Sequence, residues 1–235
     1  MSYSDISIRM RGYEHAERRV LPKRLPVLIR IDGKAFHTFT KTCKKPWDEN
    51  LEKCMNYTAL NLCQKVQNCQ VAYVQSDEIS LFLHNYKTLQ SEPWFGNVKS
   101  KIESISASMA TGCFNAHADL FLDYAPTPAF FDSRAWVLPE SEVCNYFLER
   151  QFDATRNSIF MLANSLYSAK QLQGKKGNEM QEMCFQKGYN WNDLPTYRKR
   201  GRCIIKKAGV WVIDYEVPKF NEDRNYIEQY LQGED

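Results

Sequence analysis

Residues 70–75 (QVAYVQ) and 78–84 (EISLFLH) are two apolar segments separated by only Ser76-Asp77. Both segments are rich in β-branched and aromatic side chains, which are typical of strands. A two-residue connection between such segments predicts antiparallel strands joined by a tight hairpin. The hairpin therefore fixes the direction of two neighbouring strands and restricts the sheets that the remaining chain can form.

The segments around the hairpin supply further strands and helices. Residues 25–31 (LPVLIRI) form a β-branched run that stops at Asp32-Gly33, which predicts a buried strand. Apolar residues in 46–67 recur on one helical face, with Pro46 near the first turn. The remaining predicted elements are a helix over 97–120, a strand over 129–138, a helix from about 139 to 168, a helix over about 178–187, a basic loop over 188–209 and a strand over 210–216.

The order of these elements up to residue 138 is βαββαβ, the ferredoxin-like unit. We therefore predict an α+β protein with a core domain over residues 1–138. Residues 139–235 are expected to form a mostly helical, basic second part. No Gly/Ser-rich linker divides the two parts, so we expect them to pack as one body.

The composition narrows the class of protein. No apolar run approaches the roughly 20 residues that a transmembrane helix needs. The N-terminus lacks the apolar region of a secretory signal, and Asp5, Glu14 and Glu17 count against a transit peptide. None of the eight cysteines forms a C-x-x-C pair, which favours buried free thiols over a zinc site or a disulfide framework. We therefore expect a cytoplasmic protein.

Charge is concentrated rather than large. The net charge is only +3, but residues 197–207 (YRKRGRCIIKK) hold six cations and no acid. A patch of this density favours contacts with phosphate groups. A solvated surface loop explains the same pattern equally well, and both interpretations stay open at this point.

Asp32 and Asp77 are the residues most indicative of chemistry. In a βαββαβ sheet the first and third strands are antiparallel neighbours, so the end of one and the start of the other lie at one edge. Two carboxylates about 4 Å apart repel by about 4 kcal/mol at an effective dielectric near 20. A shared proton or a cation would offset this repulsion. Asp-Gly and Ser-Asp-Glu are also ordinary turn sequences, so a turn without chemistry remains an alternative.

Magnesium suits such a site because it prefers hard oxygen ligands and takes part of its coordination shell from phosphates. Two ions would hold the attacking and leaving oxygens of an in-line displacement. Gly33 permits a close backbone approach, so its carbonyl is a further candidate ligand. Lys34 through His37, with Ser76, then surround the expected triphosphate. These residues suggest a metal-dependent nucleotide enzyme.

Five separated blocks carry a resemblance to a known family. In chain order they are Arg30-Ile31-Asp32-Gly33-Lys34-Ala35-Phe36-His37, Lys45-Pro46, Gln75-Ser76-Asp77-Glu78, Phe131-Asp132-Ser133-Arg134 and residues 187–201 (KGYNWNDLPTYRKRG). This pattern resembles the tRNA-histidine guanylyltransferase superfamily over about residues 9–207. The family builds RNA in the 3′-to-5′ direction on a fold similar to the palm of ordinary polymerases, so the resemblance implies a palm-like catalytic domain and a nucleotidyltransferase.

The resemblance also implies roles for individual residues. Asp32, the Gly33 carbonyl and Asp77 would bind two magnesium ions, and Asp32, Asp77 and Glu78 would be the catalytic carboxylates. The nucleotide-binding residues would be Asp32, Gly33, Lys34, Ala35, Phe36, His37, Lys45, Ser76 and Asp77. The substrates would be tRNA, GTP and other nucleoside triphosphates, with ATP for activation of the 5′ end. A homotetramer is typical of the family.

One segment departs from the eukaryotic guanylyltransferases. They carry His-Ile-Asn-Asn where this chain reads Thr155-Arg156-Asn157-Ser158. In lacking the His-Ile-Asn-Asn motif, this chain is similar to guanylyltransferase-like proteins, which prefer templated addition to 5′-truncated tRNAs. The resemblance therefore favours templated tRNA 5′-end repair, a 3′–5′ polymerase activity, over strict addition of G to tRNA-His.

The candidates for RNA contact are Arg134, Arg156, Asn157, Arg198, Lys199, Arg200 and Arg202. Arg156 either faces phosphate or pairs with an acidic residue one helical turn back. Tyr189, Trp191 and Tyr197 either stack on bases or pack in the core.

Two other classes of function compete with this interpretation. A nucleotide cyclase shares the aspartate pair but does not account for the later blocks. A non-catalytic RNA-binding βαββαβ module would need exposed aromatic residues on its central strands, where this chain has mainly aliphatic ones.

Overall fold

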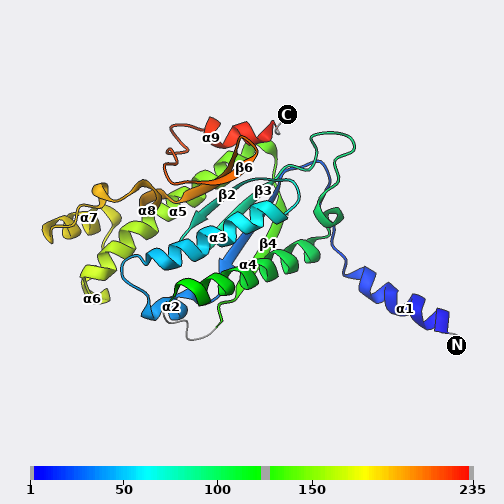
Figure 1. Ribbon diagram of the computed structural model, residues 1–235, viewed down its shortest axis with the longest axis horizontal. Coiled ribbons are helices and arrows are strands. Elements are labelled where there is room, and N and C mark those ends of the chain that lie inside the picture. Colours follow the sequence, from blue (N-terminus) through cyan, green and yellow to red (C-terminus); the bar gives the residue numbers. More distant parts are fainter. Residues whose placement is uncertain (1–2, 123–127, 233–235) are drawn as a thin grey trace.

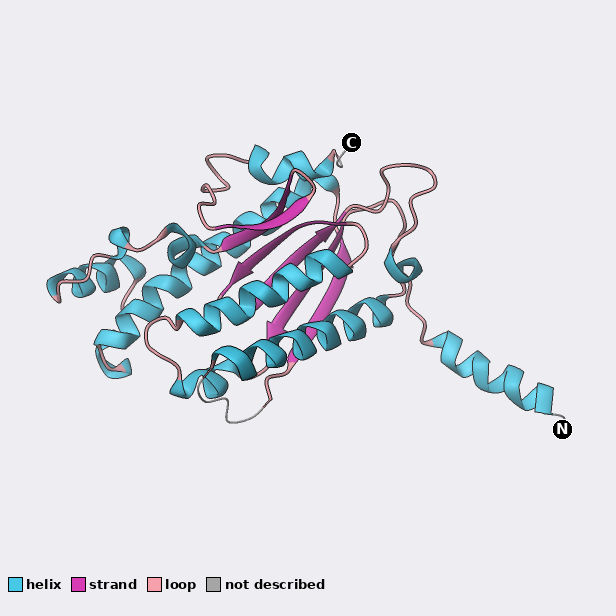
Figure 2. Cartoon of the chain, in the orientation of Figure 1, coloured by secondary structure: helices cyan, strands magenta, loops and turns pink. Residues whose placement is uncertain are grey.

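The computed structural model describes residues 3–122 and 128–232, which form one antiparallel sheet with helices on both of its faces (Figures 1 and 2). The strands are β1 Val27–Gly33, β2 Cys69–Gln75, β3 Glu78–Leu83, β4 Phe131–Val137, β5 Arg202–Lys207 and β6 Val210–Asp214. The α-helices are α1 Tyr3–Ala16, α2 Phe36–Phe39, α3 Glu49–Lys65, α4 Lys99–Phe121, α5 Glu140–Leu166, α6 Ala169–Leu172, α7 Gly177–Gln186, α8 Thr196–Arg200 and α9 Asn225–Glu228. Short 3₁₀ turns cover Thr40–Thr42, Trp94–Asn97, Trp191–Asp193 and Gln229–Leu231.

The strand order is β4-β1-β3-β2-β5-β6. Its first four members have the arrangement of the ferredoxin-like unit, with β1 between β3 and β4 and antiparallel to both. The predicted α+β class and βαββαβ core are confirmed. The predicted strand over 210–216 is also present, as β6.

Alternation along the strands determines what reaches each face of the sheet. Val27, Ile29 and Ile31 of β1 pack in the core beneath α3 and α4, whereas Leu28 belongs to the core beneath α5. Complete burial of each such aliphatic side chain contributes about 1.5–3 kcal/mol, which fixes the register strongly. Because side chains alternate, Arg30 and Asp32 lie on the α5 side of the sheet.

Helix α5 is longer than the part of the sheet that it covers. Its first half packs on the sheet, and its second half forms a separate apolar cluster with α6 and α7 (Figure 1). Ile159 and Leu162 of α5 contribute to that cluster, together with Met180 and Cys184 of α7. The polar residues near the middle of α5 are thus held against the end of the sheet.

The predicted basic loop over 188–209 is wrong in part, because it contains α8 and β5. Strand β5 pairs with β2 through Ala72↔Ile204. Its apolar centre, residues 203–205, is buried in the core. The cations on both sides of this short apolar centre made the segment resemble a solvated loop in the sequence. Both predicted parts of the chain therefore share one sheet, and the division at residue 138 stays a prediction about sequence organisation.

The helix expected over 46–67 begins later than predicted, at Glu49. The carboxylate of Asp48 accepts hydrogen bonds from the backbone N–H groups of Asn50 at 2.9 Å and Leu51 at 3.2 Å. Asp48 is therefore the N-cap, and the residues before it form a loop instead of a first turn. That loop brings Lys45 and Trp47 to the cavity described below.

Helix α1 lies apart from the sheet, whereas most of the cysteines lie inside the protein. Helix α1 has no buried residue and extends away from the body of the molecule (Figure 1). Six of the eight cysteines are buried. Within residues 3–122 and 128–232, no helix combines the length and the apolar character needed to cross a membrane.

Candidate active site

The two predicted aspartates meet at one edge of the sheet. Asp32 of β1 is paired in register with Glu78 of β3, the residue that follows Asp77. The backbone N–H of Gly33 donates to the carbonyl of Asp77 at 3.1 Å, which ties the end of β1 to the hairpin turn. A Cβ at Gly33 would collide with the ring of Phe36, so this position requires glycine. The predicted geometry is therefore present.

The carboxylates at this edge differ in how their charge is compensated. Asp32 pairs with Arg30, with 3.0 Å between Oδ2 and Nε. Glu78 pairs with Arg150 of α5, with 3.0 Å between Oε2 and Nη1. No lysine or arginine in the described ranges forms an ion pair with Asp77. Burial, and to a lesser extent the charge of Asp32, raises the pKa of the Asp77 carboxyl. The edge therefore has an uncompensated negative charge.

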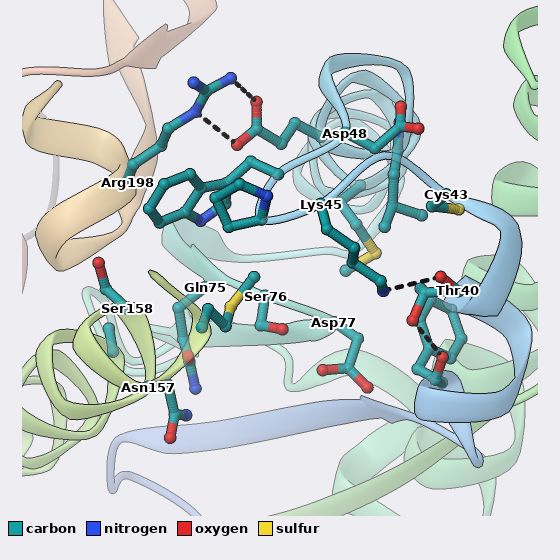
Figure 3. Close-up of a pocket in the computed structure, with 18 of the residues that line it drawn as sticks. Thr40, Cys43, Lys45, Asp48, Gln75, Ser76, Asp77, Asn157, Ser158 and Arg198 are labelled. Carbon is teal, nitrogen blue, oxygen red and sulfur yellow. Dashed lines mark hydrogen bonds and ion pairs between the residues drawn. The ribbon is translucent and has the colours of Figure 1, made fainter. Parts of the chain in front are cut away.

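A cavity of about 720 Å³ opens beside Asp77 (Figure 3). This volume is within the range of about 300–1,000 Å³ that is usual for small-molecule sites. Seven of the predicted nucleotide-binding residues line it, namely Gly33, Ala35, Phe36, His37, Lys45, Ser76 and Asp77. Asp32 and Lys34 do not line it. The structure thus brings most of the predicted set to one cavity.

The rest of the cavity lining comes mainly from the loop before α3, from the start of α3, from α5 and from α8. Lys45 donates through Nζ to the carbonyl of Thr40 at 2.8 Å (Figure 3). Arg198 of α8 forms a two-pronged ion pair with Glu52 of α3, with both N–O distances at 3.1 Å. The Arg198 guanidinium also lies 5.5 Å from the ring centroid of Trp47. This network holds an aromatic side chain at the cavity wall.

A family model described as tRNA-His guanylyltransferase matches residues 7–139, more than half of the chain. The chain belongs to this family. Its members are tRNA guanylyltransferases, so the chain is an enzyme of the nucleotidyltransferase class. The resemblance stated from the sequence blocks is confirmed.

Curated relatives of the guanylyltransferase family match most of this chain. A probable tRNA(His) guanylyltransferase of Drosophila melanogaster is 32% identical over 196 residues, which cover 77% of this chain and 67% of the relative. The tRNA(His) guanylyltransferase of Saccharomyces cerevisiae is 31% identical over 206 residues, covering 78% and 84%.

Solved guanylyltransferase-like structures match still more closely. A bacterial tRNA(His) guanylyltransferase-like protein in complex with ATP has a TM-score of 0.92 and 47% identity, covering 96% of this chain and 99% of that one. A second bacterial guanylyltransferase-like structure, in complex with GTP, has a TM-score of 0.83 and 42% identity, covering 97% and 99%. Each of these two guanylyltransferase-like proteins was thus solved with a nucleoside triphosphate bound.

The candidates for RNA contact in this guanylyltransferase-family chain are placed in three different ways. Arg134 and Arg156 are exposed, with 61% and 76% of their side chains accessible, although each pairs with a nearby aspartate. Asn157 lines the cavity, as does Arg198, whose ion pair is described above. Lys199 donates to the carbonyl of Asn192 at 2.6 Å. Arg200 contacts the Tyr73 side chain through its backbone, because its carbonyl accepts a hydrogen bond from the Tyr73 hydroxyl at 2.7 Å.

Arg202, the last of the RNA-contact candidates, is buried. It is only 4% exposed, and its guanidinium donates to Asn56 Oδ1 inside the protein. Its position in β5, which pairs with β2, draws the side chain into the core. Arg202 nevertheless lines the cavity, so its predicted contact with RNA stays a prediction.

Sequence reasoning missed several residues that shape the site. Trp47, Asp48 and Glu52 line the cavity, and Gln75 does so from the end of β2. Arg150 contacts the carboxylate edge from α5. Gln75 lies inside one of the five blocks that resemble the family and Arg150 lies outside all of them, and no role was assigned to either. Their position beside the predicted catalytic carboxylates became visible only in the fold.

Proposed function

We propose that this enzyme adds nucleotides to the 5′ end of truncated tRNA, in the 3′–5′ direction and under the direction of the opposing template base. The observation that carries the proposal is the segment Thr155-Arg156-Asn157-Ser158. It replaces the His-Ile-Asn-Asn of eukaryotic guanylyltransferases, and two of its members, Asn157 and Ser158, line the cavity beside Asp77. The segment that distinguishes the two activities thus lies at the candidate active site.

The donor atoms at the sheet edge fit magnesium. Among the described residues, no three His, Cys, Asp or Glu side chains are grouped closely enough to hold a metal alone. Asp32 and Asp77 supply two carboxylates, and the carbonyl of Gly33 supplies a third hard oxygen. Magnesium commonly binds through one or two carboxylates and completes its shell with water and phosphate oxygens. When bound, two ions would neutralise charge on the phosphate and on the attacking and leaving oxygens.

The residues of the chain then bind and orient the reactants. Lys45 and Ser76 would contact the triphosphate, because both line the cavity next to Asp77. The 5′ end of the tRNA either receives AMP from ATP or already carries a triphosphate. The 3′-hydroxyl of the incoming nucleotide attacks that 5′ phosphorus, and AMP or pyrophosphate leaves. The contribution of the protein is mainly positioning and neutralisation of charge.

The test is an extension assay with tRNA that lacks its first 5′ nucleotide. Four versions differ only in the base opposite the missing position, and each is supplied with all four nucleoside triphosphates. The proposal expects the complementary nucleotide to be added in every version. Addition of G whatever the opposing base would overturn the proposal.

The second candidate is a tRNA-His guanylyltransferase proper. It is favoured by the names of the curated relatives, which are 31–32% identical to this chain. The same assay identifies this activity by addition of G alone.

We further propose that the enzyme acts in the cytoplasm as a homotetramer. The exposed Phe152 and Phe160 on α5, which are 58% and 49% accessible, offer apolar surface for another copy. The buried thiols suit a reducing compartment. Light scattering of the purified protein should give a mass near four chains, and the mass of one chain would contradict the tetramer.

A further inference from the structure

Two glutamines of similar burial have opposite environments. Gln151 of α5 is 4% exposed, and both ends of its amide are bonded to backbone. Its Nε2 donates to the carbonyl of Pro218 at 2.9 Å, and its Oε1 accepts from the N–H of Phe220 at 2.9 Å. Gln75 is 5% exposed, yet its amide has no hydrogen-bond partner anywhere in residues 3–122 and 128–232. Buried amides are normally bonded, so Gln75 requires an explanation.

The amide of Gln75 reaches the cavity. Gln75 is a lining residue at the end of β2, directly before Ser76 and Asp77 (Figure 3). Among described side chains, the polar atoms that are both sealed from solvent and unbonded are Asn85 Oδ1 and Tyr86 Oη. The unbonded amide of Gln75 is therefore not sealed in the core and opens onto the cavity. Because the described chain provides no partner, a bound molecule is the natural one.

Two further polar groups of the same cavity have open hydrogen-bonding capacity. Asn157 of α5 makes one long hydrogen bond, from Nδ2 to Asp153 at 3.4 Å, and its Oδ1 has no partner among the described residues. Ser158 accepts a hydrogen bond from Trp191 Nε1 at 3.0 Å, which leaves its hydroxyl proton free to donate. Gln75, Asn157 and Ser158 lie on the α5 side of the cavity (Figure 3).

The position of Gln75 relative to Asp77 indicates which chemical group would bind its amide. Gln75 is two residues from Asp77, and two residues span at most about 7 Å. In a nucleotide whose phosphates lie at Asp77, the sugar is the next group along the molecule. A carboxamide both donates and accepts, and so does a hydroxyl, whereas a phosphate only accepts. We propose that Gln75, with Asn157, binds the ribose hydroxyls of a nucleotide held at this site. The proposal rests on the placement of phosphates at Asp77 in the proposed function.

This assignment makes Gln75 a specificity-determining residue. A site built to hydrogen-bond a substrate hydroxyl rejects the analogue that lacks it, because buried polar groups are then left unpaired. The enzyme is therefore expected to prefer ribonucleotides to deoxyribonucleotides. Two sources of ribose share this chemistry, the free nucleoside triphosphate and the terminal nucleotide of the RNA.

The first experiment measures binding by calorimetry, with no transfer reaction required. ATP, 2′-deoxy-ATP and 3′-deoxy-ATP are titrated with magnesium into the wild-type protein, Gln75→Met and Asn157→Leu. The wild type is expected to bind ATP about tenfold more tightly than at least one deoxy analogue. A tenfold difference is the effect expected when one hydrogen bond to a hydroxyl is lost. Both variants are expected to lose most of that preference. A parallel arm uses truncated tRNA with a 2′-deoxy terminal nucleotide, which identifies the RNA as the source if only this arm discriminates.

The matched control is Gln151→Met, which removes an equally buried amide that is fully bonded. Gln151→Met is expected to lower the melting temperature and keep the ribose preference. Gln75→Met is expected to leave the melting temperature unchanged or raise it, because the amide that it removes has no partner. Equal binding of ribo and deoxy ligands by the wild type in both arms would overturn the proposal, whether or not the variants fold. So would an unchanged preference in Gln75→Met. A failure of templated extension would leave these results standing.

Discussion

At the scale of single residues, Asp77 is the residue on which the proposed metal site most depends. Its carboxylate is buried, lies near the charge of Asp32 and has no cationic partner in the described chain. Such a group destabilises the metal-free protein and becomes favourable only when a cation binds. This opposition between stability and function is what a metal ligand is expected to show.

We predict that Asp77→Asn reduces nucleotide addition by at least about 100-fold, because it removes the charge of a proposed metal ligand. The melting temperature without magnesium should stay the same or rise, since a buried charge is lost. Activity assays and thermal unfolding measure the two effects. Asp132→Asn is the control, because that carboxylate is 56% exposed on the neighbouring strand. Full activity of Asp77→Asn with magnesium present would disprove the site.

His84, at the far end of β3, provides a pH test that is independent of the metal. Burial lowers the pKa of its imidazole below the ordinary value of 6.5. A depressed pKa means that the folded state binds the proton less readily than the unfolded chain. The stabilisation is therefore present above pH 6.5 and is lost as the pH falls towards the folded-state pKa. Urea titrations from pH 7 to pH 5 should show a smaller loss of unfolding free energy in His84→Asn than in the wild type. Equal losses would contradict this assignment.

At the scale of secondary-structure elements, the contact between α5 and the sheet edge positions Glu78. Arg150 and Glu78 form an ion pair whose side chains are 13% and 7% exposed. Arg150 Nη1 also lies 3.7 Å from Asp153 Oδ2. Removing one member of a buried pair leaves an uncompensated charge, whereas removing both does not.

Arg150→Met is accordingly predicted to lower the free energy of unfolding by about 3–5 kcal/mol. The double variant Arg150→Met with Glu78→Gln should recover most of that loss. Chemical denaturation of the wild type, both single variants and the double variant measures the coupling. Additive losses in the double variant would show that the pair does not hold the helix against the sheet edge.

The elements also show what periodicity predicts and what it does not. The hairpin around Ser76-Asp77 and the strand ending at Asp32 were predictable, because alternation and turn residues are local signals. Strand β5 was not, since its short apolar centre is surrounded by cations. The burial of Arg202 against Asn56 depends on packing between residues 146 positions apart, which no local pattern records.

The candidate site also had a part that was predictable from the sequence and a part that depended on the folded structure. Asp32 and Asp77 were placed together by topology alone, because neighbouring antiparallel strands bring fixed positions side by side. The unbonded amide of Gln75 was not predictable, since it depends on which partners the folded chain fails to provide.

At the scale of the whole molecule, both predicted parts of the chain contribute to one cavity. Asp77 and Lys45 come from the first part, and Asn157 and Arg198 come from the second. The sheet is continuous across them, with β5 paired to β2. The proposed reaction joins an RNA end to a nucleotide, so reactants approaching from both parts of the chain would meet beside Asp77.

The direction of synthesis is tested most directly by following the γ-phosphate of the incoming nucleotide. Truncated tRNA is incubated with magnesium and a nucleoside triphosphate labelled at the γ-phosphate. In 3′–5′ addition the 3′-hydroxyl of the nucleotide attacks the 5′ end of the RNA, so the account predicts that the label is retained on the elongated tRNA. Release of the label as pyrophosphate, with the nucleotide joined to the 3′ end, would contradict it.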